Sequence, residues 1–370
     1  MDSAAGIVIN GTANIGYINL YAIPGKNLPM EQILRKSLNR LLYSTVRTLH
    51  HQMSIGTSTA ENSQMHSSTE IISKLQELRF EKPILNHRDV IDYGSTGFVA
   101  DPFLFCDSDG IYHLFFEVFS PQITPTASIG HAISQDSGVS WRYDRIVFQT
   151  DRHVSFPFVF SKGGQVYLLP DLSNKGERYS PARLYRSTDF PVGWEPVADI
   201  INADHKCLDT VLFEHDGLWW AIMGGGNNDE IRVYFSEVLT AVEWVPHPEN
   251  PVVTDRCEAG RPAGRPVVSD NSIIVFYQDC RKEYGSAVNA YELVQLSQTT
   301  YEDRKLTEKP VLSGVGGIAW NSGRMHHVDM QTVDDTLLIA VDGDVGWGRN
   351  QYTGSLWSIG FESVDITVDE

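Results

Sequence analysis

Five positions recur at nearly regular intervals along the chain, each at the start of a short apolar segment, and four of the five are ionisable. The five recurring positions are Asp101, Phe156, Asp209, Arg265 and His327. A second set, which ends the apolar segment that follows each of these, adds three carboxylates. Its members are Glu117, Asp171, Gly224, Gln278 and Asp342. Two carboxyl groups roughly 5 to 9.5 Å apart can serve glycoside hydrolysis as acid and base or nucleophile. If the fold brings these positions together, the pattern predicts acid–base chemistry on a sugar.

These positions lie in a repeat of paired strands around a polar turn. The turns are Asp109-Gly110, Gly163-Gly164, Asp216-Gly217, Asp270-Asn271 and Asp334-Asp335, which are 54, 53, 54 and 64 positions apart. An apolar strand precedes and follows each turn, and third and fourth strands follow in most units. Four short strands per roughly 40 to 55 residues are typical of a propeller blade, because one small sheet cannot bury both faces without neighbours. We therefore expect an all-β fold, a five-bladed β-propeller, with a β-sandwich or barrel as the alternative.

The first strand of each blade lines the central channel of a propeller, so the five strand starts should meet at one end of the axis. Buried carboxylates are costly unless they are paired or take up a proton. Acids clustered with Arg265 and His327 therefore form either a salt-bridged plug that fixes the ring or a site. We favour a site, because perturbed carboxylates in a concave funnel usually mark function. Four aromatic residues are candidates for stacking on a sugar. They are Trp219, Trp220, Tyr284 and Trp320.

The composition narrows the class of partner. The chain has 370 residues with 29 Lys and Arg against 47 Asp and Glu, a net charge of −18. Such a surface repels phosphate backbones and anionic lipid, so we expect no nucleic-acid partner. The four cysteines stand singly without the spacing of a zinc site, and we expect no metal or cofactor. Without a signal-like start or a long apolar run, stable membrane insertion is not expected and a cytoplasmic or otherwise soluble location is the default. The oligomeric state stays open.

The N-terminal part differs in pattern from the repeats. Residues 1–79 are expected to form a helical extension, with one amphipathic helix at about 30–52 and a polar linker at 54–68. The propeller is expected to occupy residues 80–370. Its last blade would be completed from both ends of this range, by residues 80–85 and 352–361, because closing the ring removes exposed sheet edges.

Several motifs together resemble a known family. They are Phe98-Val-Ala-Asp-Pro-Phe-Leu-Phe, His153-Val-Ser-Phe-Pro-Phe-Val-Phe, Arg183-Leu-Tyr-Arg, Gln278-Asp-Cys, Tyr284-Gly and His326-His-Val-Asp. This set, spread over about residues 95–345, resembles the N-terminal domain of plant glucosamine inositolphosphorylceramide transferases. In those proteins the glycosyltransferase chemistry belongs to a separate downstream domain, so the resemblance does not imply glycosyl transfer. That N-terminal domain is similar in fold to five-bladed arabinanase, xylosidase and invertase-type glycoside hydrolases.

The likeness to these hydrolases implies roles for particular residues. Asp101 would be the general base, Asp209 would tune and orient the acid, and Glu258 is the candidate general acid. Five further residues are expected to bind the sugar, and the acids among them are alternatives for the general acid. They are Glu117, Asp171, Arg265, Asp279 and His327. The leading hypothesis is a carbohydrate-active propeller that binds a glycan or glycoconjugate, with its hydrolysis as the expected chemistry. The alternative is a non-catalytic glycan-binding or scaffold module.

Overall fold

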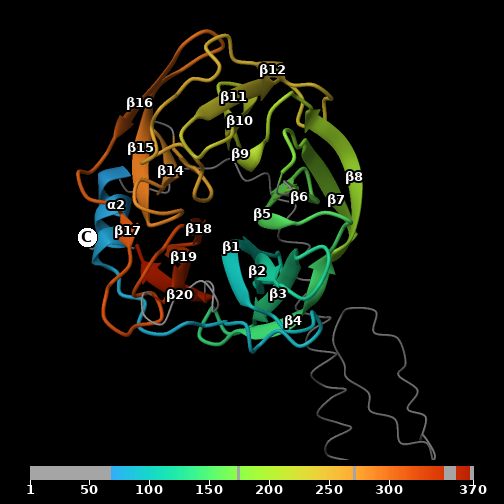
Figure 1. Cartoon of the computed structure of the whole chain (residues 1–370), viewed down its shortest axis with the longest axis vertical. Coiled ribbons are helices and arrows are strands. Elements are labelled where there is room, and N and C mark those ends of the chain that lie inside the picture. Colours follow the sequence, from blue (N-terminus) through green and yellow to red (C-terminus); the bar gives the residue numbers. More distant parts are fainter. Residues whose placement is uncertain (1–67, 173–175, 270–271, 346–355, 367–370) are drawn as a thin grey trace, which may run out of the picture. The chain divides into compact units, whose positions relative to one another are not determined.

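A computed structural model describes residues 68–172, 176–269, 272–345 and 356–366. All of these residues belong to one compact unit, Asn62–Glu370. Five antiparallel sheets stand around a central axis like the blades of a propeller (Figure 1). The expected all-β, five-bladed fold is confirmed. The helix expected at about 30–52 and the linker up to residue 67 lie outside the described residues.

Each of the first three blades takes its strands from one continuous stretch of the chain. Blade 1 consists of β1 (Phe98–Cys106), β2 (Tyr112–Phe119), β3 (Ala127–Ser134) and β4 (Arg142–Phe148). Blade 2 consists of β5 (Ser155–Lys162), β6 (Gln165–Asp171), β7 (Ala182–Asp189) and β8 (Val192–Ile201). Blade 3 consists of β9 (Leu208–His215), β10 (Leu218–Gly224), β11 (Ile231–Ser236) and β12 (Val245–Pro246).

The last two blades are less regular. Blade 4 consists of β13 (Val267–Val268), β14 (Ile273–Asp279), β15 (Ala287–Leu296) and β16 (Tyr301–Lys305), with β17 (Leu312–Ser313) also paired to β15. Blade 5 consists of β18 (Val328–Val333), β19 (Thr336–Asp344) and β20 (Trp357–Asp365). A bridge between Leu85 and Ile359 adds the segment before blade 1 to the edge of β20. The chain therefore completes its last blade from both ends, as expected.

The repeated turns are tight connections between the first and second strands of a blade. Gly110, Gly164 and Gly217 each have φ 74°, a left-handed conformation that costs a glycine nothing. This explains why three of the five turns end in glycine. The corresponding turn of blade 4 falls on residues 270–271, outside the described residues.

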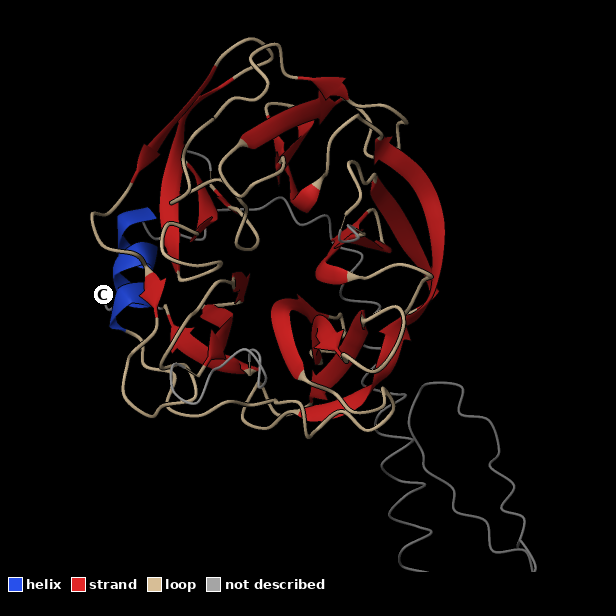
Figure 2. Cartoon of the chain, in the orientation of Figure 1, coloured by secondary structure: helices blue, strands red, loops and turns tan. Residues whose placement is uncertain are grey.

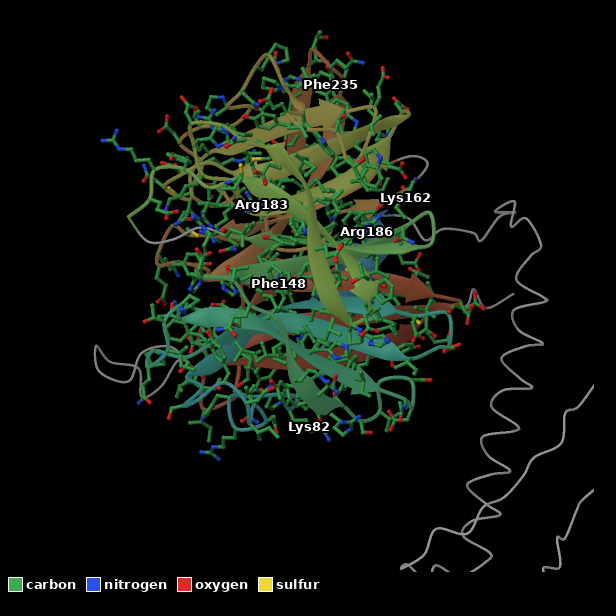
Figure 3. The ribbon with its side chains drawn as sticks, turned by 90° about the vertical axis from the view of Figure 1, so that its right-hand side faces the viewer. Lys82, Phe148, Lys162, Arg183, Arg186 and Phe235 are labelled. Carbon is green, nitrogen blue, oxygen red and sulfur yellow. The ribbon has the colours of Figure 1, made fainter. Side chains whose placement is uncertain are left out.

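One family motif belongs to the outer part of a blade. Arg183 and Arg186 lie in β7, the third strand of blade 2, and Figure 3 shows them on the side of the molecule. The Arg183 guanidinium pairs with Asp199 of the neighbouring strand β8, while Leu184 between them is fully buried. This motif stabilises the blade and does not contribute to the central channel.

A short helix, α2 (Ser68–Glu77), packs against the propeller, and Figure 2 shows it beside the strands of the last two blades. Ile72 and Leu75 are buried in a cluster with Phe80 and with core residues of blades 4 and 5. Their spacing places both on one helix face. The sequence analysis missed this helix because the preceding polar segment was interpreted as a linker. No described helix is long and apolar enough to cross a membrane.

Replacing Leu75 with alanine tests whether α2 is an integral part of the fold. Leu75 is 1% exposed, so Leu75→Ala should lower the free energy of unfolding by about 2–5 kcal/mol through lost burial and a cavity. Urea unfolding measures the change. The exposed neighbour Glu77 provides the control, and Glu77→Ala should stay within about 0.5 kcal/mol of the wild type. Equal stability of the two variants would show that the helix does not dock.

Candidate functional site

The strand starts of the first three blades share an unusual backbone. Asp101, Phe156 and Asp209 have φ of 52°, 47° and 49°, in the left-handed region that side chains other than glycine rarely adopt. Each lies where the register between the first two strands of its blade shifts. A left-handed residue in a strand persists only where its surroundings hold it. The surroundings here are carboxylates of the neighbouring blades.

Three carboxylates bind backbone amides across blade boundaries. Asp342 Oδ2 accepts a hydrogen bond from the amide of Asp101, 3.2 Å away. Asp101 Oδ2 accepts one from the amide of Phe156, also at 3.2 Å, and Asp171 Oδ2 accepts one from the amide of Asp209 at the same distance. We call these contacts the interblade clasps. They join blade 5 to blade 1, blade 1 to blade 2 and blade 2 to blade 3, always at the left-handed residue.

Blade 4 meets Asp209 through side chains. The guanidinium of Arg261 binds both carboxylate oxygens of Asp209, with Nη2 3.0 Å from Oδ1, and Gln278 Nε2 donates to Oδ2 at 2.9 Å. Arg261 also lies 3.8 Å from Asp171. Burial raises the pKa of Asp209 to about 6, although the charge of Arg261 opposes this shift. Asp209 is thus a buried carboxylate whose oxygens are committed to blade 4.

Blade 5 contributes a buried ion pair. His326 Nδ1 lies 2.6 Å from Asp342 Oδ2, and its Nε2 lies 3.8 Å from Asp101 Oδ1. Burial disfavours the charged imidazole, but Asp342 outweighs this and raises the pKa of His326. In return, burial works against the charge of Asp342, yet His326 holds the pKa of Asp342 below its usual value. The His326 ring stacks on Trp357, with centroids 4.1 Å apart.

Two acids of the cluster keep oxygens that the protein does not use. No described residue donates a hydrogen bond to Asp101 Oδ1 or to the carboxyl group of Glu117. Glu117 Oε1 lies 3.4 Å from His153 Nε2, and burial lowers the pKa of this histidine. Burial raises the pKa of Asp101 to about 7. Burial, followed by the charges of Asp101 and Asp209, raises the pKa of Glu117 well above its ordinary value. Asp101 is therefore poised to exchange a proton near neutral pH, and the protonated form of Glu117 is favoured.

Tyr284 provides the exposed aromatic surface beside this cluster. Its side chain lies between Arg261, whose guanidinium carbon is 5.3 Å from the ring centroid, and His326, whose ring centroid is 5.4 Å away. Tyr284 is 39% exposed. Two of the other aromatic candidates, Trp219 and Trp220, are buried in blade 3, so they offer no face to a ligand.

Arg265 and His327 lie in a second layer of the channel. Arg265 Nε donates to Asp329 Oδ1 at 2.9 Å, and its Nη2 donates to the carbonyl oxygens of Val159 and Leu104. The ring of His327 packs against Phe103, and burial lowers the pKa of His327 to about 3, so the imidazole is neutral. His327 Nδ1 still lies 3.9 Å from Asp101, whereas Arg265 contacts neither Asp101 nor Asp209. Arg265 with Asp329 therefore forms a salt-bridged plug next to the acidic cluster.

Two other expected site residues lie apart from the cluster. Asp279 is bound by Arg281, with Nη2 2.6 Å from Oδ2, and its pKa is held down by this partner against the effect of burial. Hydrogen bonding to Asp279 raises the pKa of Arg281, and the charge of Glu258 adds to this shift. Glu258 thus lies near Arg281, and its carboxylate has no interaction with Asp101 or Asp209 among the described contacts.

Arg261 and His326 are the functional candidates that sequence reasoning missed. Blade 4 contains two Arg-Pro pairs, Arg261-Pro262 and Arg265-Pro266, and counting back from the turn selected the second. In the structure Pro262 pairs with Tyr277, so the strand facing β14 starts four residues earlier than counted. The residue–proline step at the strand start, as in Asp101-Pro102, occurs in both pairs, so it does not separate Arg261 from Arg265 in the sequence.

One group of residues has the spacing of a metal site. The ligand atoms of Asp101, His326 and Asp342 all lie within 4.8 Å of one another, and the three residues are buried. An ion there would have to replace the close contact between His326 and Asp342. We base no chemistry on a metal.

Sequence comparison gives a consistent picture. The family model described as "Glucosamine inositolphosphorylceramide transferase 1, N-terminal" matches residues 67–344. Glucosamine inositolphosphorylceramide transferase 1 of Arabidopsis thaliana is 32% identical over 257 residues, which cover 67% of this chain and 32% of that protein. The protein of the same name from Oryza sativa subsp. japonica is 33% identical over 262 residues, with coverages of 67% and 33%. The chain spans about a third of the length of these relatives.

Solved structures with a similar fold are glycoside hydrolases. An α-L-arabinofuranosidase from Podospora anserina, in complex with cellotriose, superposes with a TM-score of 0.57 at 13% identity, over 76% of this chain and 94% of that one. An α-L-arabinanase from Penicillium chrysogenum, with arabinobiose, gives a TM-score of 0.52 at 15% identity, over 77% and 97%. At such identities the likeness shows a shared fold and no shared activity.

Replacing Arg261 should lower the free energy of unfolding far more than replacing an arginine on the surface. Arg261→Met leaves the buried carboxylate of Asp209 without its cation, which should lower the free energy of unfolding by about 3–5 kcal/mol. Arg281→Ala breaks the pair with Asp279 but removes a side chain that is 54% exposed, and should cost about 0–1 kcal/mol. Urea denaturation of both variants measures the difference. Similar losses would show that Arg261 is not a central element of the cluster.

The raised pKa of Asp101 also predicts a dependence of stability on pH. Between about pH 4 and 7 the folded state keeps a proton on Asp101 that the unfolded chain has lost, so the unfolding free energy falls as pH rises through this window. Asp101→Asn cannot titrate, and its amide oxygen still accepts the amide of Phe156. The difference in stability between wild type and variant should therefore change by a few kcal/mol across the window. Urea unfolding from pH 4.5 to 8 measures the free energy of unfolding of both proteins. If the two free energies changed in parallel with pH, the raised pKa of Asp101 would be contradicted.

Proposed function

Because the chain belongs to the family of glucosamine inositolphosphorylceramide transferase N-terminal domains, we propose that its propeller binds a glycan at the acidic end of the channel and hydrolyses a glycosidic bond there. The family suggests a glycan-related role, and the fold is one that glycoside hydrolases use. The observation that carries the proposal is the state of Asp101 and Glu117, two buried acids with uncommitted oxygens and raised pKa values.

The roles of these acids follow from their surroundings. Asp101 is the general base, since Oδ1 has no protein donor and is available to a water molecule. Glu117 is the general acid in place of Glu258, because burial and the neighbouring carboxylates raise its pKa and so favour its protonated form. Asp209 acts as the modulator, since its charge is one of those that raise the pKa of Glu117. Arg261 keeps Asp209 fixed in this role.

The proposed reaction is a single displacement. Asp101 takes a proton from water as the water oxygen forms a bond to the anomeric carbon. The bond from that carbon to the glycosidic oxygen breaks, and Glu117 gives its proton to the departing oxygen. Exchange of protons with solvent restores both carboxyl groups. Since Asp101 must be ionised, the rate should rise with pH through about 7.

Sugar recognition is assigned to the exposed ring beside the cluster. Tyr284 presents an aromatic face on which the C–H groups of a sugar can stack. Arg261 is less suited to direct binding, because it is engaged with Asp209 and its Nη1 donates to Asn228. Tyr284 is thus the residue we expect to set affinity for the glycan.

A glycan-binding module without catalysis is the second candidate. It is favoured by the interblade clasps, which give Asp101, Asp171 and Asp342 a structural use that needs no chemistry. It is also favoured by the position of Glu258 near Arg281, apart from Asp101. In this case the acidic end of the channel would bind a glycan and release no sugar.

Charge-neutral variants of the two acids separate these functions. On a panel of plant and microbial oligosaccharides, Asp101→Asn and Glu117→Gln should each reduce sugar release by about 10²–10⁴-fold, because each removes one proton transfer. Both should retain glycan binding, measured by calorimetry. Glu258→Gln is the matched control and should keep full activity.

Three outcomes would change the conclusion. Loss of activity in Glu258→Gln but not in Glu117→Gln would exclude Glu117 as the acid. Binding without release by the wild type would establish the non-catalytic module. If the wild type neither bound a glycan of the panel nor released sugar from one, a glycan function of the acidic end of the channel would be contradicted.

A further inference from the structure

A pocket lies toward the other end of the strands that line the channel. It is bordered by Phe105 and Phe160, near the ends of β1 and β5, and by Val267 and Met330 of blades 4 and 5. The Asp101 cluster, by contrast, lies where the first strands of the blades begin. Figure 1 shows these first strands around the centre of the ring. The pocket has a volume of about 430 Å³, which is in the range of sites for small molecules. We call it the rear pocket.

The walls of the rear pocket combine apolar and polar groups. They include aromatic rings from blades 1 and 2, aliphatic side chains from blades 4 and 5, and Ile71 from α2, beside the polar side chains of Ser161, Gln331 and Thr332. Of the described residues that line it, Arg265 alone is charged. Apolar side chains beside one charged anchor can bind a ligand by its apolar body and orient it by its charged end.

Arg265 has donors left for a ligand. Nε donates to Asp329, and Nη2 donates to the carbonyl oxygens of Val159 and Leu104. Nη1 carries two more N–H groups and donates to none of the described residues. The side chain is 16% exposed, whereas Asp329 is fully buried on the Nε side. The Arg265–Asp329 pair therefore presents the guanidinium of Arg265 to the rear pocket.

We propose that the rear pocket binds a small amphiphilic carboxylate, whose oxygens accept hydrogen bonds from Arg265 Nη1 and whose hydrocarbon part packs on Phe105, Phe160 and Met330. A charged acceptor is favoured over a neutral hydroxyl because charge-assisted hydrogen bonds are roughly twice as strong. This site is independent of the glycan function proposed for the acidic end.

Methionine methyl NMR tests this proposal with defined probes. The chain has 7 methionines, and Met330→Leu identifies the signal of Met330. Titration with hexanoate should shift that signal saturably, and 1-hexanol should bind at least tenfold more weakly. Arg265→Lys keeps a cation beside Asp329 but removes Nη1, and should reduce hexanoate affinity to that of hexanol.

A second variant keeps the test decisive if Arg265→Lys does not fold. Val268 is 38% exposed at the edge of the pocket, so Val268→Trp can fill it without disturbing the core, and should abolish the hexanoate-dependent shift. Asp101→Asn should leave hexanoate binding unchanged. Equal affinity for hexanoate and hexanol, an unmoved Met330 signal, or unaltered binding by Val268→Trp would each overturn the proposal.

Discussion

Hydrogen bonds from backbone amides to buried carboxylates of the neighbouring blade are the interaction on which the axial end of this propeller depends. Where the first strand of a blade begins, a backbone amide points away from its own sheet. In a ring of separate sheets such an amide needs a hydrogen-bond acceptor from elsewhere. Here Asp342, Asp101 and Asp171 do so at three successive boundaries, each for a residue with left-handed backbone. An unsatisfied buried amide would cost about 1–3 kcal/mol. The acidity of the channel is thus first a consequence of how the ring is joined.

The same arrangement divides the acids into two kinds. Asp342 and Asp209 are neutralised by His326 and Arg261, and their oxygens are fully used. Arg265 performs a corresponding task in the next layer, where it connects blade 4 to Asp329 of blade 5, Leu104 of blade 1 and Val159 of blade 2. Pairing on this scale allows a set of acids to be buried near the axis at tolerable cost. The carboxylate oxygens that receive no hydrogen bond from the described residues are therefore informative about function.

The sequence was a good guide to the fold and a partial guide to the site. Turns and strands are local features, so a repeat of about 54 residues was enough to predict blades. Side-chain positions depend on register, and a slip of one residue in a strand reverses the face. Hence His327 was selected where His326 makes the closer contacts with the acids. Arg265 was selected in place of Arg261 because the strand facing β14 starts four residues earlier than counted. Asp101, Asp209 and Glu117 were found because blades 1 to 3 keep their spacing.

The contrast between Asp101 and Asp342 is the physical reason to look for chemistry at this site. Both carboxylates accept a backbone amide across a blade boundary, so both have a structural role. A carboxylate that served only this role would be expected to resemble Asp342, fully bonded and with a lowered pKa. Asp101 instead leaves Oδ1 without a donor among the described residues, and its pKa is raised to about 7. An asparagine would provide the same clasp and tolerate the same left-handed backbone without the cost of a buried titratable group. The presence of an acid where an amide would suffice therefore favours a function that requires the proton.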